Sequence, residues 1–284
     1  MRRVLILLAL TALCACTTTT TAPAIDFANV FANRELVDLT WPYDEHTLYW
    51  PTSPSAFELK QLANGPTPGG WFYSANSICT PEHGGTHLDA PIHFAEGKTT
   101  VDRIPLERLI APAIVIDIAD RAAANADYRL TADDVRAWES QNGTIAAGTI
   151  VLLRTGWGKR WPDRKSYFGD DTPGATDNLH FPSYGEDAAH LLVEQRHVAA
   201  IGVDTASIDY GQSHDFIVHR IANGADVPGI ENIANLERLP ARGTLLMALP
   251  MKIAGGSGGP VRIVALIPEG RAQRAEDEAA NGTK

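Results

Sequence analysis

The sequence predicts a single α/β domain in which a mixed β-sheet is flanked by helices. Short apolar runs of strand length alternate along the chain with segments of helical pattern, an order typical of α/β and mixed α+β folds. No internal repeat and no linker interrupts residues 25–269, and a chain of 284 residues is long enough to bury a sizeable core. We therefore expect one globular domain over 25–269, followed by a polar tail over 270–284.

The predicted strands are apolar runs bounded by glycine, proline or polar residues. In chain order they are expected at 35–40, 71–78, 113–118, 148–154, 197–204, 243–249 and 261–267. Helices are expected at 104–109, 131–140, 183–195 and 216–223. Thr131 with Asp134, and Ser183 with Glu186, have the spacing of a capping box and predict two of the helix starts. Residues 41–54 and 157–179 are expected to be irregular loops.

The N-terminus has the pattern of a signal peptide over 1–15. Two arginines precede an apolar run over 4–13, which is too short to span a bilayer comfortably. The run ends in Leu-Cys-Ala-Cys, which resembles a bacterial lipoprotein cleavage box and predicts lipidation of Cys16; a plain secretory signal cut near Ala15 is the alternative. We expect a threonine-rich tether over 16–24 and an exported, periplasm-facing lipoprotein. Thr17 after the cysteine favours the outer membrane.

Charge and cysteine content limit the possible binding partners and disulfide bonds. The formal net charge of −10 argues against nucleic acid as a partner. Removal of the signal would leave Cys16 and Cys79, and lipidation of the first excludes an intrachain disulfide. Cys79 lies four residues before His83, so it is either a thiolate ligand or a buried structural thiol, and we favour the buried thiol.

One short stretch concentrates the residues that bind metal ions. Residues 83–94 read HGGTHLDAPIHF and hold three of the nine histidines and an aspartate. Imidazole and carboxylate are the ligands of a borderline divalent cation such as Zn²⁺ or Mn²⁺. The glycines and the proline disfavour a helix, and in an extended run Asp89 shares a face with His87. The stretch therefore predicts a metal site with His83, His87, Asp89 and, as a further candidate, His93.

A second part of the site must come from elsewhere in the chain. The remaining candidates are histidines with acidic residues nearby: His180, His190, His197, His214 and His219. We favour His219, because Glu231 follows twelve residues later in an apolar segment, where a buried carboxylate is costly unless it is paired or coordinated.

These residues resemble the cyclase family of metal-dependent hydrolases, which includes bacterial kynurenine formamidases and isatin hydrolases. The family signature H-x-G-T-H-x-D-A-P-x-H-F is present in full over 83–94. The similarity continues through most of the chain, at 37–40, 151–157, 201–209, 219–232 and 258–262. One departure is Trp41, where many members have a histidine.

The resemblance implies a swivelling β/β/α-type fold and a homodimer or homotetramer. It implies that His83, His87 and Asp89 hold a first metal, Mn²⁺ or Zn²⁺. It further implies that His93, His219 and Glu231 bind a second metal or act on water and substrate. We assign His93 and His219 to proton transfer and Glu231 to metal binding. The implied reaction is hydrolysis of a C–N amide bond, in an aryl formamide such as N-formylkynurenine or a cyclic amide such as isatin.

Other interpretations of the same residues remain open at this point. Trp50 and Phe72 are predicted to stack on an aryl substrate, although either could be a packing residue. His87, Asp89 and His219 also fit the 2-His-1-carboxylate pattern of non-haem iron oxidoreductases, which leaves two histidines unexplained. A metal-dependent binding lipoprotein without turnover is the other alternative. The glycine-rich run 255–259 lacks a following Gly-Lys-Ser/Thr, so we expect a tight loop near the site.

Overall fold

The computed structural model describes residues 31–270, and every element named below belongs to the unit that begins at Asn33. The predicted signal peptide, the Cys16 lipidation site, the tether and nearly all of the polar tail lie outside the described residues. Within residues 31–270, no helix is both long and apolar enough to cross a bilayer.

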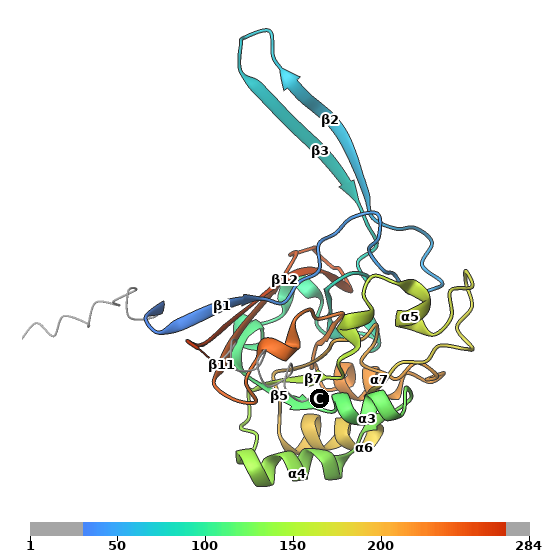
Figure 1. Ribbon diagram of the computed structural model, residues 1–284, viewed down its shortest axis with the longest axis vertical. Coiled ribbons are helices and arrows are strands. Elements are labelled where there is room, and N and C mark those ends of the chain that lie inside the picture. Colours follow the sequence, from blue (N-terminus) through green and yellow to red (C-terminus); the bar gives the residue numbers. More distant parts are fainter. Residues whose placement is uncertain (1–30, 271–284) are drawn as a thin grey trace, which may run out of the picture. The chain divides into compact units, whose positions relative to one another are not determined.

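The central sheet is mixed, as predicted, and it closes on itself (Figure 1). Its strands are β1 (Arg34–Asp38), β4 (His87–Asp89), β5 (Ile110–Asp117), β7 (Ile150–Arg154), β9 (Ala200–Val203), β10 (Gly229–Glu231), β11 (Thr244–Pro250) and β12 (Gly258–Pro268). They run in the order β1-β12-β11-β5-β7-β9-β10-β4, with an additional β12–β4 pairing that closes seven strands into a barrel-like ring. Strands β5, β7, β9 and β10 are parallel, and the other pairings are antiparallel.

Both faces of the parallel strands β5, β7 and β9 are packed with apolar side chains. In β7, Ile150 and Leu152 point into the cluster inside the ring, whereas Val151 and Leu153 belong to the cluster under the helices. Successive strand residues alternate between faces, so a strand covered on both sides needs an unbroken apolar run. This is why the strands at 113–118 and 148–154 could be recognised in the sequence.

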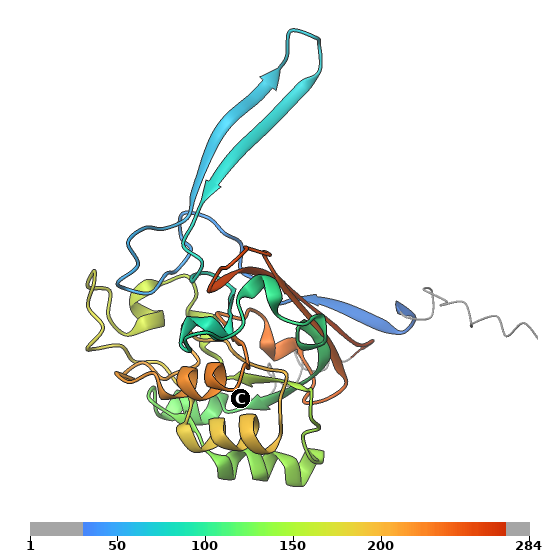
Figure 2. The same cartoon turned by 180° about the vertical axis from the view of Figure 1, so that it is seen from behind.

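Helices cover the outer face of the parallel strands (Figures 1 and 2). They are α3 (Ala119–Ala124), α4 (Ala132–Asn142), α6 (Glu186–His190) with a π-helical turn over Leu191–Gln195, and α7 (Ile217–Gly224). Helix α2 (Leu106–Leu109) packs on β5 and β11 and contributes Leu109 to the cluster inside the ring, and α5 (Arg164–Phe168) contributes Tyr167 and Phe168 to a third apolar cluster. Short 3-10 turns lie at Pro91–His93, Val101–Arg103, Trp157–Arg160 and Leu236–Arg238. The predicted loop over 157–179 is therefore partly helical, since it contains α5 and one of these turns.

Of the two predicted capping boxes, one is confirmed and one is wrong. Thr131 accepts a hydrogen bond from the Asp134 backbone amide, and the Asp134 carboxylate accepts one from Thr131. Ser183 instead lies in β8 (Ser183–Tyr184), which pairs with β6 (Arg129–Leu130), and its hydroxyl donates to the Ser207 carbonyl. Gly185 is the N-cap residue of α6.

A hairpin of β2 (Glu58–Pro66) and β3 (Phe72–Cys79) projects away from the ring (Figures 1 and 2). The two strands form a separate two-stranded sheet. Most of their side chains are exposed, including several large apolar ones: Leu59, Leu62, Phe72, Tyr73 and Ile78. No face of β2 is buried, so no alternating pattern marked it in the sequence. For the same reason Cys79 is exposed, and the expectation of a buried thiol is wrong.

Candidate metal centre

Strand β4 places two of the predicted ligands on one face. His87 and Asp89 are buried there, while Leu88 between them points into the core of the ring. Pairing on both edges fixes the strand: Glu231 of β10 lies opposite His87, and Gly258 of β12 lies opposite Asp89. The sheet register thus brings Glu231 to the predicted site from 144 residues away.

The turn before β4 depends on its glycines. Gly85 has φ +56, and a Cβ on it would lie 2.6 Å from the ring of Tyr43. The Tyr43 hydroxyl lies 2.5 Å from the Gly84 carbonyl oxygen and 2.8 Å from that of Thr86, which holds the tight turn in place. Residues 83–90 contain no helix, which confirms the prediction made from the glycines and the proline.

Asp89 is the centre of the cluster. Its Oδ1 lies 2.6 Å from His83 Nδ1 and 3.2 Å from His87 Nε2, and its Oδ2 lies 3.3 Å from His219 Nε2. Glu231 approaches the same atoms, with Oε2 3.4 Å from His87 Nε2 and Oε1 3.2 Å from His219 Nε2.

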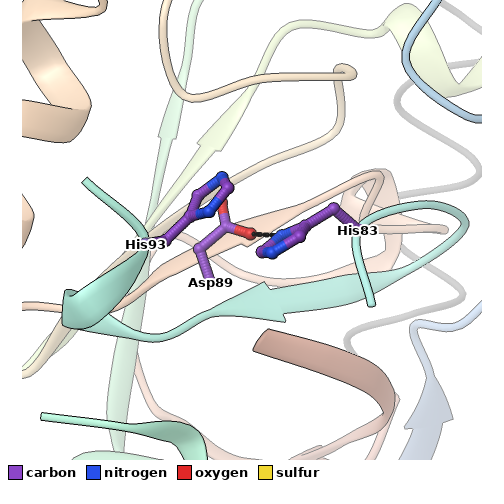
Figure 3. Close-up of side chains that lie close together, drawn as sticks. All are labelled: His83, Asp89 and His93. Atoms are coloured by element: carbon purple, nitrogen blue, oxygen red, sulfur yellow. Dashed lines mark hydrogen bonds and ion pairs between the residues drawn. The ribbon is translucent and has the colours of Figure 1, made fainter. Parts of the chain in front are cut away.

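Two groups of residues have the spacing to hold a metal ion, and they share Asp89. The first is His83, Asp89 and His93, and the second is His87, Asp89 and Glu231. Figure 3 shows the first group, with the His83 and His93 rings converging on the Asp89 carboxylate. The donor set of imidazole nitrogen and carboxylate oxygen suits Zn²⁺ or Mn²⁺.

The contacts of the two His87 ring nitrogens indicate whether the cluster can hold a cation. Its Nδ1 lies 3.0 Å from the Gly85 carbonyl, which can only accept, so Nδ1 carries the proton and the neutral ring directs the Nε2 lone pair at two carboxylates. Burial opposes charging this ring, but Asp89 and Glu231 raise the pKa of His87 to about 9. The buried cluster thus favours a positive charge where these atoms meet, which a divalent metal ion supplies.

His93 behaves differently from the other histidines. Its ring stacks on His83, with centroids 3.8 Å apart and planes at 17°. Burial lowers the pKa of His93 to about 4; neighbouring imidazoles add to this effect, while Asp89 opposes it. His93 is therefore neutral near pH 7 and available as a ligand or a proton acceptor.

His219 is oriented by a carboxylate that sequence reasoning did not select. Its Nδ1 lies 2.7 Å from Asp209 Oδ2, so Nε2 points toward Asp89 and Glu231. Asp209 also accepts from the backbone amides of Val218 and His219, which anchors it to the start of α7. Burial disfavours a charged His219, but hydrogen bonds to carboxylates hold its pKa well above the usual value.

Asn232 is a second contributor that sequence reasoning did not single out. Its side-chain amide donates to the Gly85 carbonyl at 2.7 Å, the same oxygen that holds His87. Its own Oδ1 accepts from the Tyr167 hydroxyl. The only sequence signal for this role is its place directly after Glu231.

A cavity of about 220 Å³ opens onto these groups. The site histidines and Glu231 form its polar part, and its wall is largely aromatic: Tyr49, Trp50, Phe94, Phe168 and Phe216. Trp50 meets Phe168 and Phe216 edge to face, with centroids 6.4 and 6.2 Å apart. The structure thus places Trp50 in the wall of the cavity that contains the site histidines and Glu231.

The sequence predicts that Phe72 contacts the substrate, but the described chain does not bring it to the cavity. It lies on β3 and is 68% exposed, because the hairpin carries it away from the ring. Within one copy of the chain, nothing supports its predicted contact with substrate.

Comparisons with known proteins agree with this geometry. The family model named Cyclase matches residues 37–210. Isatin hydrolase of Roseibium aggregatum is 38% identical over 208 residues, covering 70% of this chain and 77% of that protein. Kynurenine formamidase of Salinibacter ruber is 31% identical, covering 66% and 77%.

The crystal structure of an isatin hydrolase bound to the product analogue thioisatinate superposes with a TM-score of 0.78. It has 32% sequence identity and covers 85% of this chain and 95% of its own. The predicted mixed α/β fold and the predicted resemblance are thereby confirmed, and the chain belongs to the Cyclase family.

Proposed function

We propose that this protein hydrolyses the C–N bond of an aryl amide, either a cyclic amide such as isatin or an N-formyl amide such as N-formylkynurenine. The observation that carries the proposal is the position of the His/Asp/Glu cluster at an aromatic-walled cavity. The greater identity to isatin hydrolase favours the cyclic amide as the first substrate to test.

His83, His87, Asp89 and Glu231 would hold the divalent metal. When bound, such an ion supplies a Lewis acid and acidifies water at the site. Both Mn²⁺ and Zn²⁺ are compatible with this donor set, which contains no thiolate.

Two histidines supply the proton transfers. His93 is neutral near pH 7 and takes a proton from the attacking water as it adds to the carbonyl carbon. His219 is held in its protonated form by Asp209 and delivers a proton to the nitrogen as the C–N bond breaks. The products are a carboxylic acid and an amine, and transfer of a proton from His93 to His219, directly or through solvent, restores the starting state.

The aromatic wall positions the substrate ring. Trp50 and Phe216 present ring faces and edges on which an aryl group packs at offset or T-shaped geometry. Closing apolar side chains around the scissile bond also excludes bulk water, which strengthens the electrostatic contacts within the cavity.

The decisive experiment combines elemental analysis of the purified protein with a panel of isatin, N-formylkynurenine and unsubstituted aliphatic amides, monitored by mass spectrometry. We expect bound Mn or Zn, ring opening or deformylation of an aryl substrate, and no turnover of the aliphatic amides. Full metal content without cleavage of any aryl amide would contradict the proposal. Oxygen consumption with Fe(II) would instead indicate an oxidoreductase.

We further propose that the chain forms a homo-oligomer, a homodimer or homotetramer. The support is the β2–β3 hairpin, whose large exposed apolar side chains have no covering layer within the described chain. A two-stranded sheet alone is marginally stable in water, and exposed apolar patches of this kind mark interaction surfaces.

The lipid anchor at Cys16 also remains a proposal, with the signal peptide over 1–15 and a position at the outer membrane facing the periplasm. Its support is the cleavage-box pattern alone. We expect the natural protein to fractionate with membranes and a Cys16→Ala variant to be released. Recovery of both in the soluble fraction would contradict the anchor.

A further inference from the structure

The glycine-rich run 255–259 has no part in the proposed chemistry, yet it lies against the metal centre. The Ser257 carbonyl accepts a hydrogen bond from the Ala90 amide at 2.8 Å. Gly258 begins β12 and pairs with Asp89. The loop is thus joined to β4 on both sides of the shared carboxylate ligand.

Ser257 connects His83 to the carboxylate of Glu82. Its hydroxyl lies 2.6 Å from Glu82 Oε2, and its backbone amide lies 3.0 Å from the same oxygen. A carboxylate only accepts hydrogen bonds, so the single hydroxyl proton of Ser257 goes to Glu82. The serine oxygen is left as an acceptor, and His83 Nε2 lies 2.9 Å from it.

This arrangement determines the tautomer of His83. A neutral ring has one N–H, and Ser257 draws it to Nε2. In this tautomer the unprotonated Nδ1 faces Asp89 Oδ1 at 2.6 Å, and the repulsion between these two acceptors is relieved when both bind a metal ion. We infer that Glu82 and Ser257 are positioning residues of the metal centre, which fix His83 in the tautomer that offers Nδ1 as the ligand atom. This inference rests on the metal-dependent function proposed above.

The same contacts explain the glycines of the loop. A Cβ at position 256 would lie 2.6 Å from Glu82 Oε1. A Cβ at position 258 would lie 2.7 Å from His83 Cε1 and 2.6 Å from the Leu88 carbonyl oxygen. Both glycines leave the space that Glu82 and His83 occupy, so the run makes room for the ligand histidine and its partner.

Removing either partner should let the proton move to the wrong nitrogen. In a Ser257→Ala variant, Nε2 loses its acceptor, and an Nδ1–H donated to Asp89 becomes the favoured tautomer. In Glu82→Ala the serine hydroxyl is free to donate to Nε2, which gives the same result without touching His83. The proton on Nδ1 then occupies the place of the metal, and the loss of a residue that orients a ligand histidine weakens metal binding roughly 10–100-fold.

Two further variants serve as matched controls. Glu82→Gln keeps a carbonyl oxygen that can accept from Ser257, so it should restore the tautomer and the metal affinity. Asp102 accepts from the Gly255 amide and tethers the same loop without contacting His83, so Asp102→Ala tests whether loop position alone matters.

The experiment measures Zn²⁺ affinity of the full chain by chelator competition and the His83 tautomer by ¹⁵N-edited NMR of metal-free and zinc-loaded protein. We expect weaker Zn²⁺ binding and an Nδ1–H tautomer in Ser257→Ala and Glu82→Ala. Wild type, Glu82→Gln and Asp102→Ala should share one affinity and an Nε2–H tautomer.

The outcomes separate this inference from the proposed function. If wild type binds metal and both alanine variants bind it equally well, the inference is wrong and the metal-dependent function stands. Equal weakening by Asp102→Ala would also overturn it, because loop position would then be the cause. A wild-type protein that binds no divalent metal would overturn the proposed function itself.

Discussion

Strands β3 and β4 are neighbours in the sequence, separated only by residues 80–86, yet their environments are opposite. Strand β4 has three residues, all buried, and is paired on both edges. Strand β3 has eight residues, nearly all exposed, and pairs with β2 alone. The short strand carries buried polar side chains, whereas the long one exposes apolar side chains to solvent.

Each strand carries side chains that are in an unfavourable environment when the chain is alone. Buried carboxylates and imidazoles at β4 are costly unless they are paired or bind a cation. Exposed aromatic and aliphatic side chains on β2–β3 remain unfavourable until another surface covers them. The metal is expected to stabilise the first group and a second copy of the chain to cover the second, so substitutions in the two regions should have separable effects.

The largest effect is expected at β4, from His87→Ala. The variant loses a ligand atom that faces both Asp89 and Glu231, so it should lose its metal. A bound metal contributes several kcal/mol to catalysis, so amide hydrolysis should fall by roughly 10³-fold or more. Elemental analysis and turnover are measured together, with the exposed His46→Ala as the control. A His87→Ala variant with full metal content and full rate would show that the site is misassigned.

Replacing a glycine by alanine should lower the unfolding temperature beside β4 but leave it unchanged on the β2–β3 hairpin. In Gly258→Ala the new Cβ meets the Leu88 carbonyl and the His83 ring, so the strand or the ligand must move. Overpacking of this kind costs about 1–3 kcal/mol in stability. Gly65 on the hairpin has nothing within 4 Å of the same position, so Gly65→Ala should unfold at the wild-type temperature. Equal thermal shifts in calorimetry would contradict the contrast between the strands.

The same contrast explains which features the sequence could predict. His87 and Asp89 are two residues apart on one strand, so local periodicity alone places them on one face. The apolar runs of β5 and β7 are recognisable because both of their faces are buried. These predictions depend only on residues that are close together in the chain.

The features that sequence reasoning missed, or assigned only through the family resemblance, depend on tertiary pairing. Glu231 reaches His87 through the register of β10 against β4, and only the resemblance to a family assigned it a metal. The contacts of Asp209 with His219 and of Asn232 with Gly85 follow from the packing of α7 and of the strand ends. Strand β2 has no buried face, so the sequence does not reveal that it pairs with β3. Without β2 the hairpin is not apparent, and the exposure of Phe72 at the start of β3 cannot be predicted.

At the hairpin, a charge should change assembly and leave the metal site intact. Leu62 is 62% exposed on β2, and Leu62→Asp places a carboxylate on the apolar surface. We expect light scattering to show wild type at a multiple of the mass of one chain and the variant at the mass of one chain, with equal metal content. Lys60→Glu, on the same strand, controls for charge alone. A monomeric wild type, or a variant that still assembles, would contradict the proposed role of the hairpin.

The last prediction concerns a buried carboxylate that has no imidazole beside it, and its effect appears only as the pH changes. Asp204 accepts from the Thr155 amide and hydroxyl and from the Gly156 amide. Burial raises the pKa of Asp204 from 3.8 to about 6, although these hydrogen bonds oppose the shift. Asp89 is equally buried, but the surrounding histidines hold its pKa well below the usual value.

The raised pKa means that the folded chain binds this proton more tightly than the unfolded chain does. Asp204 therefore carries no penalty below pH 3.8, and stability is lost as the pH rises through 6. The shift corresponds to about 3 kcal/mol at full ionisation. Relative to wild type, metal-free Asp204→Asn should gain up to that amount in the free energy of unfolding between pH 4 and pH 7, measured by urea denaturation. If the difference in free energy of unfolding between the two proteins stayed constant with pH, the ionisation of Asp204 would cost no stability. Burial without a neighbouring histidine would then not raise the pKa of a carboxylate, and the contrast with Asp89 would fail.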